Sequence, residues 1–165
     1  MNHQEESAFA EINQQVDICF DKADRFFNGR FKRPSINLKQ RGRAAGTAYL
    51  ERNELRFNFY MYEQDPKKFL QTVVPHEVAH LIVHQIYNRQ ASAHGKEWRA
   101  VMEKVFNSPA ERTHTFQVKP PKVSFHYACD CQTHIFSQQR HNRALKGTQY
   151  LCKLCKRNLE YLPLD

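Results

Sequence analysis

Residues 76 to 80 read His-Glu-Val-Ala-His and lie inside a strongly apolar segment. On an α-helix, side chains four positions apart share one face, so the imidazoles of His76 and His80 can bind a single metal ion. Glu77, on the adjacent edge, can take a proton from a zinc-bound water. Polar groups buried without a partner are costly. The segment therefore predicts a buried helix that carries a hydrolytic zinc site.

A hydrolytic zinc ion keeps three protein ligands and one open position, so a third donor is required. His84 continues the same helical face, but a rise of about 1.5 Å per residue places it about 12 Å along the axis from His76, too far to bind the same ion. His94 is better placed, because residues 81–93 can complete the helix, turn and return. We predict His94 as the third ligand and Glu77 as the general base.

Hydrolysis also needs a donor or a cation that stabilises negative charge on the carbonyl oxygen. Spacing favours none of the candidates, which are Tyr60, Tyr62, Tyr87, Arg112 and His114.

Four of the five cysteines lie beyond residue 128. Cys152 and Cys155 form a C-x-x-C pair, whose turn lets two thiolates bind one tetrahedral zinc ion. The other pair is either Cys131 with His134, which repeats that spacing, or Cys129 with Cys131. We favour Cys131, His134, Cys152 and Cys155, with Cys129 as the alternative to His134. Such a closed site is structural, because it stabilises a module with too little core to fold alone.

The first part of the chain predicts an amphipathic helix followed by a small antiparallel sheet. Apolar residues recur three or four positions apart over residues 7–27, which indicates a helix ending near Gly29. Cys19 lies on this apolar stripe and is interpreted as a buried thiol rather than a ligand. Alternating runs follow, with a turn at residues 51–54. The runs comprise Ile36 and Leu38, residues 47–50, and Leu55, Phe57 and Phe59.

Two further helices are expected. Asp65 followed by Pro66 is typical of a helix start, and the helix over residues 67–87 contains Pro75, which should kink or split it. A second helix covers residues 96–106.

These elements predict an α+β chain. Its parts are a domain over residues 1–118, a linker over residues 119–123 and a zinc ribbon over residues 124–165.

The formal net charge of +8 is unevenly distributed. Residues 1–29 carry two basic and six acidic side chains, net −4, whereas residues 30–58 carry eight basic and two acidic, net +6. From residue 109 onward nine basic and four acidic side chains give net +5. Two basic regions favour a polyanion partner, with nucleic acid ahead of a membrane; a solvated surface is the alternative. The basic residues of the cysteine module are Arg140, Arg143, Lys146, Lys153, Lys156 and Arg157.

No apolar stretch approaches the roughly 18 residues needed to span a bilayer, and the first 15 residues lack the features of a secretory signal. We therefore expect a cytoplasmic protein. In that reducing compartment, clustered cysteines favour metal binding over disulfides.

The segment at residues 76–80, followed by His94-Gly95-Lys96-Glu97-Trp98, resembles the SprT-like metalloproteases, whose pattern is H-E-x-x-H and then H-G-x-x-[aromatic]. The resemblance also covers the preceding helix and sheet and the cysteine module, hence nearly the whole chain. It implies a minimal zincin-like fold, with His94 matching the third zinc ligand. It also implies relatedness to Spartan, the eukaryotic protease that degrades proteins crosslinked to DNA. Family members with C-x-x-C in both halves of the module differ from this chain.

Two classes of function fit these features. The first is a zinc metalloprotease with one catalytic and one structural zinc, which associates with single-stranded or mixed DNA and cleaves proteins bound or crosslinked to it. The second is a non-catalytic nucleic-acid-binding or regulatory protein in which both zinc ions are structural. Glu77 favours the first, because a structural site has no use for a carboxylate beside an open metal position.

Overall fold

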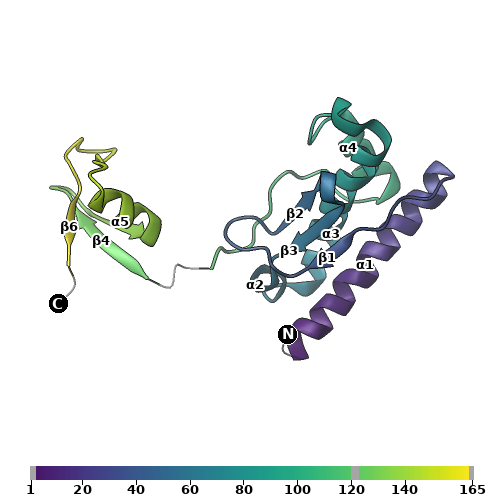
Figure 1. Ribbon diagram of the computed structural model, residues 1–165, viewed down its shortest axis with the longest axis horizontal. Coiled ribbons are helices and arrows are strands. Elements are labelled where there is room, and N and C mark those ends of the chain that lie inside the picture. Colours follow the sequence, from purple (N-terminus) through teal and green to yellow (C-terminus); the bar gives the residue numbers. More distant parts are fainter. Residues whose placement is uncertain (1–2, 120–122, 164–165) are drawn as a thin grey trace. The chain divides into compact units, whose positions relative to one another are not determined.

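The computed structural model describes residues 3–119 and 123–163 of the chain. The chain divides into two compact units, residues 1–119 and 120–165 (Figure 1). Residues 120–122, which form most of the expected linker, lie outside the described residues. Both units combine helices with a small sheet, so the expected α+β class is confirmed.

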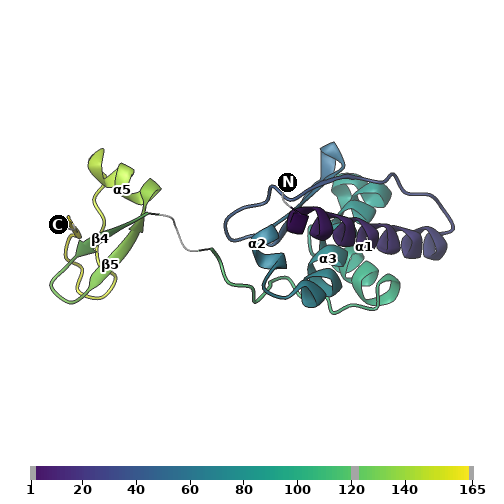
Figure 2. The same cartoon turned by 90° about the horizontal axis from the view of Figure 1, so that it is seen from below.

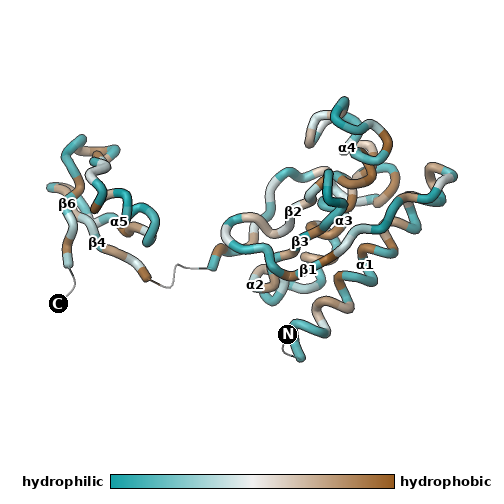
Figure 3. Tube along the Cα trace, viewed as in Figure 1, coloured by the Kyte–Doolittle hydropathy of each residue, from teal (hydrophilic) through white to brown (hydrophobic). Residues whose placement is uncertain are grey.

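The first helix, α1, spans His3–Phe27 and is amphipathic. Its polar and apolar positions alternate in Figure 3, as expected for a helix that covers one side of a core. Asn28 adopts a left-handed φ of 51°, and the Gly29 N–H donates to the Asp24 carbonyl at 3.1 Å, which ends the helix as predicted. The buried residues of α1 are Ala8, Ile12, Val16, Cys19, Phe20 and Ala23.

The sheet of the first unit contains β1 (Ser35–Asn37), β2 (Gly46–Tyr49) and β3 (Glu54–Phe57) in the order β1-β3-β2. β2 and β3 are antiparallel, as predicted, but β1 is parallel to β3. The expectation of a wholly antiparallel sheet is therefore wrong for β1. The chain leaves β1, passes through residues 38–45 and joins the sheet again on the other side of β3. No local sequence pattern indicates which strand becomes the neighbour of β1.

The predicted strand through Phe59 is too long. β3 ends at Phe57, and Phe59 begins the short helix α2 (Phe59–Tyr62). The reason is Asn58, a buried residue whose amide donates to the carbonyls of Gly42 at 3.4 Å and Ala44 at 3.2 Å. Its carbonyl accepts from the first turn of α2. Asn58 thus turns the chain and holds the loop before β2 against the sheet.

The long helix α3 spans Pro66–Tyr87. Asp65 caps it, with its carboxylate accepting from the Lys68 N–H at 2.9 Å, so the predicted start is confirmed. The helix continues through Pro75 and is not split there. Pro75 cannot donate to the Gln71 carbonyl, but the Ser108 hydroxyl donates to it instead, at 3.2 Å. This bond replaces the main-chain partner that the proline removes.

The next helix, α4 (Lys96–Ala100), continues as a π-helical turn, Val101–Val105. The chain then returns along α3 as residues 108–117, here called the return segment. Gln64, just before α3, exchanges two hydrogen bonds with the Gln117 backbone, at 2.9 and 2.8 Å. Lys68 donates to the Thr115 hydroxyl at 2.7 Å. These bonds fix the return segment against the helix that carries the H-E-x-x-H motif.

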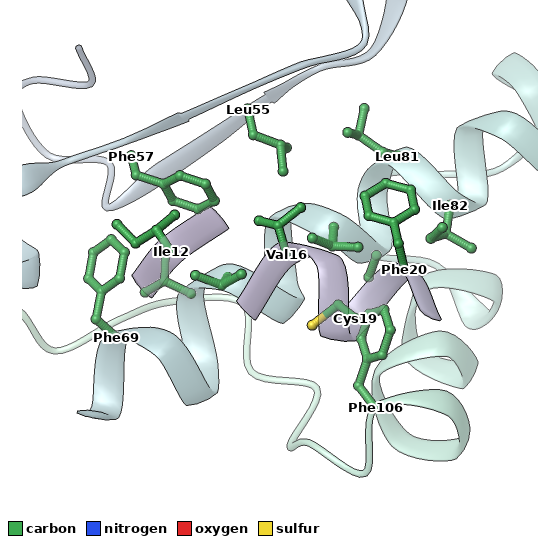
Figure 4. Close-up of a cluster of buried hydrophobic side chains, with 14 of the residues drawn as sticks. Ile12, Val16, Cys19, Phe20, Leu55, Phe57, Phe69, Leu81, Ile82 and Phe106 are labelled. Carbon is green, nitrogen blue, oxygen red and sulfur yellow. The ribbon is translucent and has the colours of Figure 1, made fainter. Parts of the chain in front are cut away.

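The core of the first unit lies between α1, α3 and the sheet. Figure 2 shows α1 and α3 side by side, and Figure 4 shows apolar side chains from both helices meeting those of β3. Cys19 is 2% exposed within this core, as expected. The largest fully buried side chains of the unit include Phe20, Leu55, Phe57, Phe69, Leu81, Ile82 and Trp98.

The second unit is an antiparallel sheet in the order β5-β4-β6 with one helix. Its elements are β4 (Ser124–Ala128), β5 (Thr133–Ser137), α5 (Gln138–Leu145) and β6 (Glu160–Leu162). Few side chains are buried. The Tyr127 ring stacks on Phe136 at 4.1 Å, and its hydroxyl lies 3.0 Å from His141 Nδ1. So small a core needs another source of stability.

None of the helices within residues 3–119 and 123–163 combines the length and the apolar character needed to cross a membrane.

Candidate metal centres

His76, His80 and His94 come together in the first unit. One ligand atom from each lies within 4.8 Å of the other two, and the Nε2 atoms of His76 and His94 are 3.1 Å apart. His76 and His80 lie one turn apart on α3, while His94 lies just before α4. Within the described ranges no fourth histidine, cysteine or acidic residue joins this group. Three imidazoles with a fourth position left open fit a zinc ion of the hydrolytic type.

Trp98 forms one wall of the three-histidine group. Its ring centroid lies 4.7 Å from that of His76, 5.6 Å from His80 and 4.7 Å from His94. The indole N–H donates to the His76 carbonyl at 3.3 Å, and the side chain is 1% exposed. Because Trp98 is packed in the core, it restricts the orientations of all three rings.

The return segment orients His76. Its Nδ1 lies 3.2 Å from the Glu111 carbonyl oxygen, so a proton on Nδ1 leaves Nε2 free to bind a metal. Burial, and then the charge of His94, lower the pKa of His76 to about 4. Burial lowers the pKa of His80 to about 3. Both rings are therefore neutral at pH 7, which is the form that binds metal. Glu111 contributes only its main chain, so its side chain gives no signal in the sequence.

His84 does not join the group. It lies one turn beyond His80 on α3, and its Nδ1 is buried without a hydrogen-bond partner among the described residues.

Glu77 directly follows His76 on α3 but is not part of the three-histidine group. The residue is 8% exposed, and burial raises the pKa of its carboxyl to about 8, opposed by a hydrogen bond from the Ala48 N–H of β2. A carboxyl group with a raised pKa is suited to accepting and releasing a proton near neutral pH. The helix thus separates two tasks, since its histidines can bind metal and Glu77 can transfer a proton.

The five candidates for charge stabilisation lie in different surroundings. Tyr62 is buried and hydrogen-bonded to Glu11, and burial raises its pKa to about 12. Tyr87 is the exposed last residue of α3, and Tyr60 lies under the Lys119 ammonium at 5.4 Å.

The return segment brings the two remaining candidates towards the histidines. The pKa of His94 is lowered first by burial and then by the charge of Arg112. The charge of His114 is a smaller contribution to the lowered pKa of His76. His114 also has its Nε2 within 2.9 Å of the Arg43 carbonyl oxygen.

A second candidate centre lies in the second unit, where the sulfur atoms of Cys129, Cys131, Cys152 and Cys155 lie within 4.8 Å of one another. The distance is 3.4 Å between Cys129 and Cys131, and 3.6 Å between Cys131 and Cys152. All are free thiols. The N–H groups of Cys155 and Leu154 face the Cys152 sulfur and lower its pKa to about 5. Four sulfurs with a thiolate-stabilising turn fit a closed tetrahedral zinc site.

This grouping differs from the favoured set, which included His134 in place of Cys129. The sequence favoured His134 because Cys131 and His134 repeat the spacing of the C-x-x-C pair, whereas Cys129 and Cys131 do not. In the structure β4 ends at Ala128, and a tight turn, closed by a hydrogen bond from the Cys129 N–H to the Gln132 carbonyl at 3.2 Å, directs both sulfurs inward. His134 remains adjacent, with Nε2 3.4 Å from the Cys129 sulfur.

The basic side chains of the second unit have different partners. The Arg140 guanidinium lies over the rings of Phe136 at 3.8 Å and Tyr150 at 4.9 Å, so it also packs against the unit. Arg157 pairs with Asp130 at 3.2 Å, where both side chains are about three-quarters exposed. The other four are exposed: Arg143, Lys146, Lys153 and Lys156.

Some positive charge in residues 30–58 is locally paired. Arg33 pairs with Asp21 at 2.6 Å and with Asp24 at 2.9 Å, and Arg56 pairs with Glu54 at 2.7 Å. Fewer positive side chains of this region are thus free to contact a polyanion than its net charge indicates.

The raised pKa of Glu77 predicts a pH dependence of stability in the metal-free protein. Glu77 binds its proton more tightly when folded, with a pKa of about 8 against its usual 4.5. Its contribution to stability is therefore present below pH 4.5 and is lost as pH rises towards 8. Glu77→Gln cannot titrate. The free energy of unfolding of the unaltered chain, minus that of Glu77→Gln, should fall over this interval. Parallel pH profiles of the two proteins would contradict the assignment.

The measurement is urea unfolding with a chelator present, followed by the fluorescence of Trp98, the single tryptophan. The lowered pKa values of His76 and His80 make stability rise with pH from about 3 to 6.5. This contribution is common to both proteins and cancels in the difference.

Metal content tests the third ligand. His94→Ala should lower the zinc retained after dialysis by about one equivalent, because two imidazoles alone bind the ion weakly. His84→Ala is the matched control, since His84 is a histidine of the same region outside the group. It should retain the full content, as measured by elemental mass spectrometry. Equal retention by the two variants would exclude His94 as a ligand.

Comparison with known proteins shows the family of the chain. The model of the SprT-like family matches residues 16–114. Protein SprT of Pseudomonas fluorescens strain SBW25 is 42% identical over 154 residues, which cover 92% of this chain and 94% of that protein. Protein SprT of Pseudomonas savastanoi pv. phaseolicola strain 1448A is 40% identical over the same shares. No solved structure matches. The chain belongs to the SprT-like family.

Proposed function

We propose that this chain is a zinc metallopeptidase with a minimal zincin-like arrangement, and that it cleaves proteins bound or crosslinked to DNA. One observation carries the enzymatic part of the proposal. A buried carboxyl group, Glu77, directly follows the first of three clustered histidines on α3 without being one of the cluster. A purely structural site fills all four positions of its ion and needs no such neighbour.

In the proposed reaction His76, His80 and His94 hold the zinc. When bound, zinc polarises the scissile carbonyl and lowers the pKa of water. Glu77 takes the proton of the attacking water and passes it to the departing amine. The Ala48 N–H holds the carboxylate in place, and Trp98 limits movement of the histidine rings. Arg112 and His114 are the candidates for stabilising charge on the carbonyl oxygen, because their charges act on the clustered histidines.

For the second unit we propose a structural zinc held by Cys129, Cys131, Cys152 and Cys155. The support is the closed grouping of the four sulfurs over a core of few side chains. We further propose that this unit contacts single-stranded or mixed DNA and brings the peptidase to protein substrates, in the reducing cytoplasm. The exposed basic residues of the unit and the exposed side chain of Tyr161 support this role.

The proposed base is tested by Glu77→Gln, which keeps the shape of the side chain but cannot accept the proton. Cleavage of a DNA-bound protein should fall by about 10²- to 10⁴-fold, the usual contribution of a general base. Zinc content should not change, because Glu77 lies outside the ligand group. The assay compares kcat for the two zinc-loaded proteins, with and without single-stranded DNA.

A zinc-loaded Glu77→Gln protein that retains full activity would eliminate Glu77 as the base. If the unaltered, zinc-loaded chain cleaves no protein under either condition, the rival function is supported, that of a non-catalytic nucleic-acid-binding or regulatory protein.

DNA contact by the second unit predicts a salt-dependent affinity. Replacing the four exposed basic residues, Arg143, Lys146, Lys153 and Lys156, with glutamine should weaken binding to single-stranded DNA. It should also reduce the slope of log affinity against log salt by about 0.7 for each lost phosphate contact. Deleting residues 124–165 should weaken binding further. Fluorescence anisotropy over a range of salt concentrations measures both effects.

The matched control is Lys22→Gln, which removes a positive charge from the acidic helix α1. It should leave the slope unchanged. An unaltered slope in the quadruple variant would refute the assignment of DNA contact to this unit.

A further inference from the structure

We propose that Gly46 is a positioning residue for Glu77, because the absence of a side chain at Gly46 lets the carboxylate lie against β2 and accept the Ala48 N–H. The inference deepens the proposed function, on which its kinetic consequence rests. Its structural part can be tested without any measurement of activity.

The space at Gly46 is already filled by Glu77. A Cβ atom built on Gly46 would lie 2.6 Å from Glu77 Cγ, 2.9 Å from Oε1 and 3.0 Å from Cδ. Contacts below 3.0 Å are essentially never made by real Cβ atoms. The φ of Gly46 lies outside the left-handed region, so the backbone of β2 does not itself require glycine. The reason for glycine at this position is therefore the approach of one side chain.

The hydrogen-bond pattern of β2 explains why Glu77 approaches there. The Asn58 N–H donates to the Ala45 carbonyl at 2.8 Å, in the same register that pairs Thr47 with Arg56. In an antiparallel pair such positions alternate. Thr47 and Tyr49 therefore bond to β3, whereas the Ala48 N–H points away from β3 along the free edge of the strand. Glu77 accepts from that N–H.

Gly46 and Ala48 thus act on the carboxylate together. The Ala48 N–H fixes the direction of the carboxylate. The missing side chain at Gly46 leaves the space in which the Glu77 side chain lies. The three atoms nearest to a new Cβ all belong to the side chain of Glu77 and not to the backbone. A small side chain at position 46 would be accommodated by moving Glu77. We therefore expect the variant to fold, with Glu77 displaced from its position.

The direct test is amide hydrogen exchange by NMR on the full, zinc-loaded chain. In Gly46→Ala the Ala48 N–H should exchange at least about 10-fold faster, because it loses a hydrogen bond to a carboxylate. The amides of Thr47 and Tyr49 bond to β3 and serve as internal controls that should not change. The matched substitution is Gly29→Ala, whose Cβ would meet only the Phe27 carbonyl oxygen at 3.8 Å. It should leave Ala48 protected.

The kinetic test compares the same proteins. Gly46→Ala should lower kcat about 100-fold, as expected for a misplaced catalytic group, while KM and zinc content stay unchanged. Gly29→Ala should behave as the unaltered chain. In the Glu77→Gln background Gly46→Ala should lower kcat no further, because the group through which it acts is already disabled. A general structural defect caused by Gly46→Ala would also lower the zinc content, and it would lower kcat further in the Glu77→Gln background.

Protection of Ala48 in Gly46→Ala, or a wild-type kcat, would overturn the proposal. If Gly46→Ala fails to fold, Gly46→Ala combined with Glu77→Ala should fold as well as Glu77→Ala alone, because the three atoms nearest to the new Cβ are then gone. Failure of that double variant to fold would also overturn it. If the unaltered chain cleaves nothing, the proposed function fails, and exchange at Ala48 still decides the role of Gly46.

Discussion

The first unit depends on the burial of α3, a helix surrounded by other elements along most of its length. Its buried residues run from Phe69 to Val83 and include Glu77. In such surroundings a polar group without a partner is costly, and on α3 only His84 Nδ1 is buried without one among the described residues. The Ala48 N–H meets Glu77, the Glu111 carbonyl meets His76 Nδ1, and the Ser108 hydroxyl replaces the donor lost at Pro75. Hydrogen bonds to polar groups of α3 thus join β2 and the return segment to this helix.

The second unit meets the opposite constraint. It has few buried side chains, chiefly Tyr127, Phe136, His141 and Cys152. Burial at roughly 25 cal/mol per Å² yields little for so few residues. The four clustered sulfurs can link the turn after β4 to the segment before β6 if they share one ion. In the first unit the packed core positions the proposed metal site. In the second unit the proposed zinc would supply the stability that the small core does not.

Much of the fold and of the site was predictable because the signals are local. The α1 stripe, the Asp65 cap and the four-residue spacing of His76 and His80 need only helix geometry, and each appears in the structure. Two features were not predicted. β1 pairs in parallel with β3 instead of antiparallel, and a turn brings Cys129 into the cysteine group, where the sequence favoured His134. The pairing of β1 joins residues far apart along the chain, which no periodicity specifies. At Cys129 the chain makes a local turn directly after β4, closed by the bond to Gln132, and the C-x-C spacing alone does not indicate this turn.

The sequence by itself determined which side chains are available for chemistry, because helical periodicity and ligand spacing are written in residue types. It also determined where α3 begins. Only the tertiary structure decided how those side chains are held, because the partners of Glu77 and His76 are main-chain groups of Ala48 and Glu111. Every residue but proline offers the same N–H, and every residue the same carbonyl. Their use is therefore invisible until the chain folds and brings β2 and the return segment to α3.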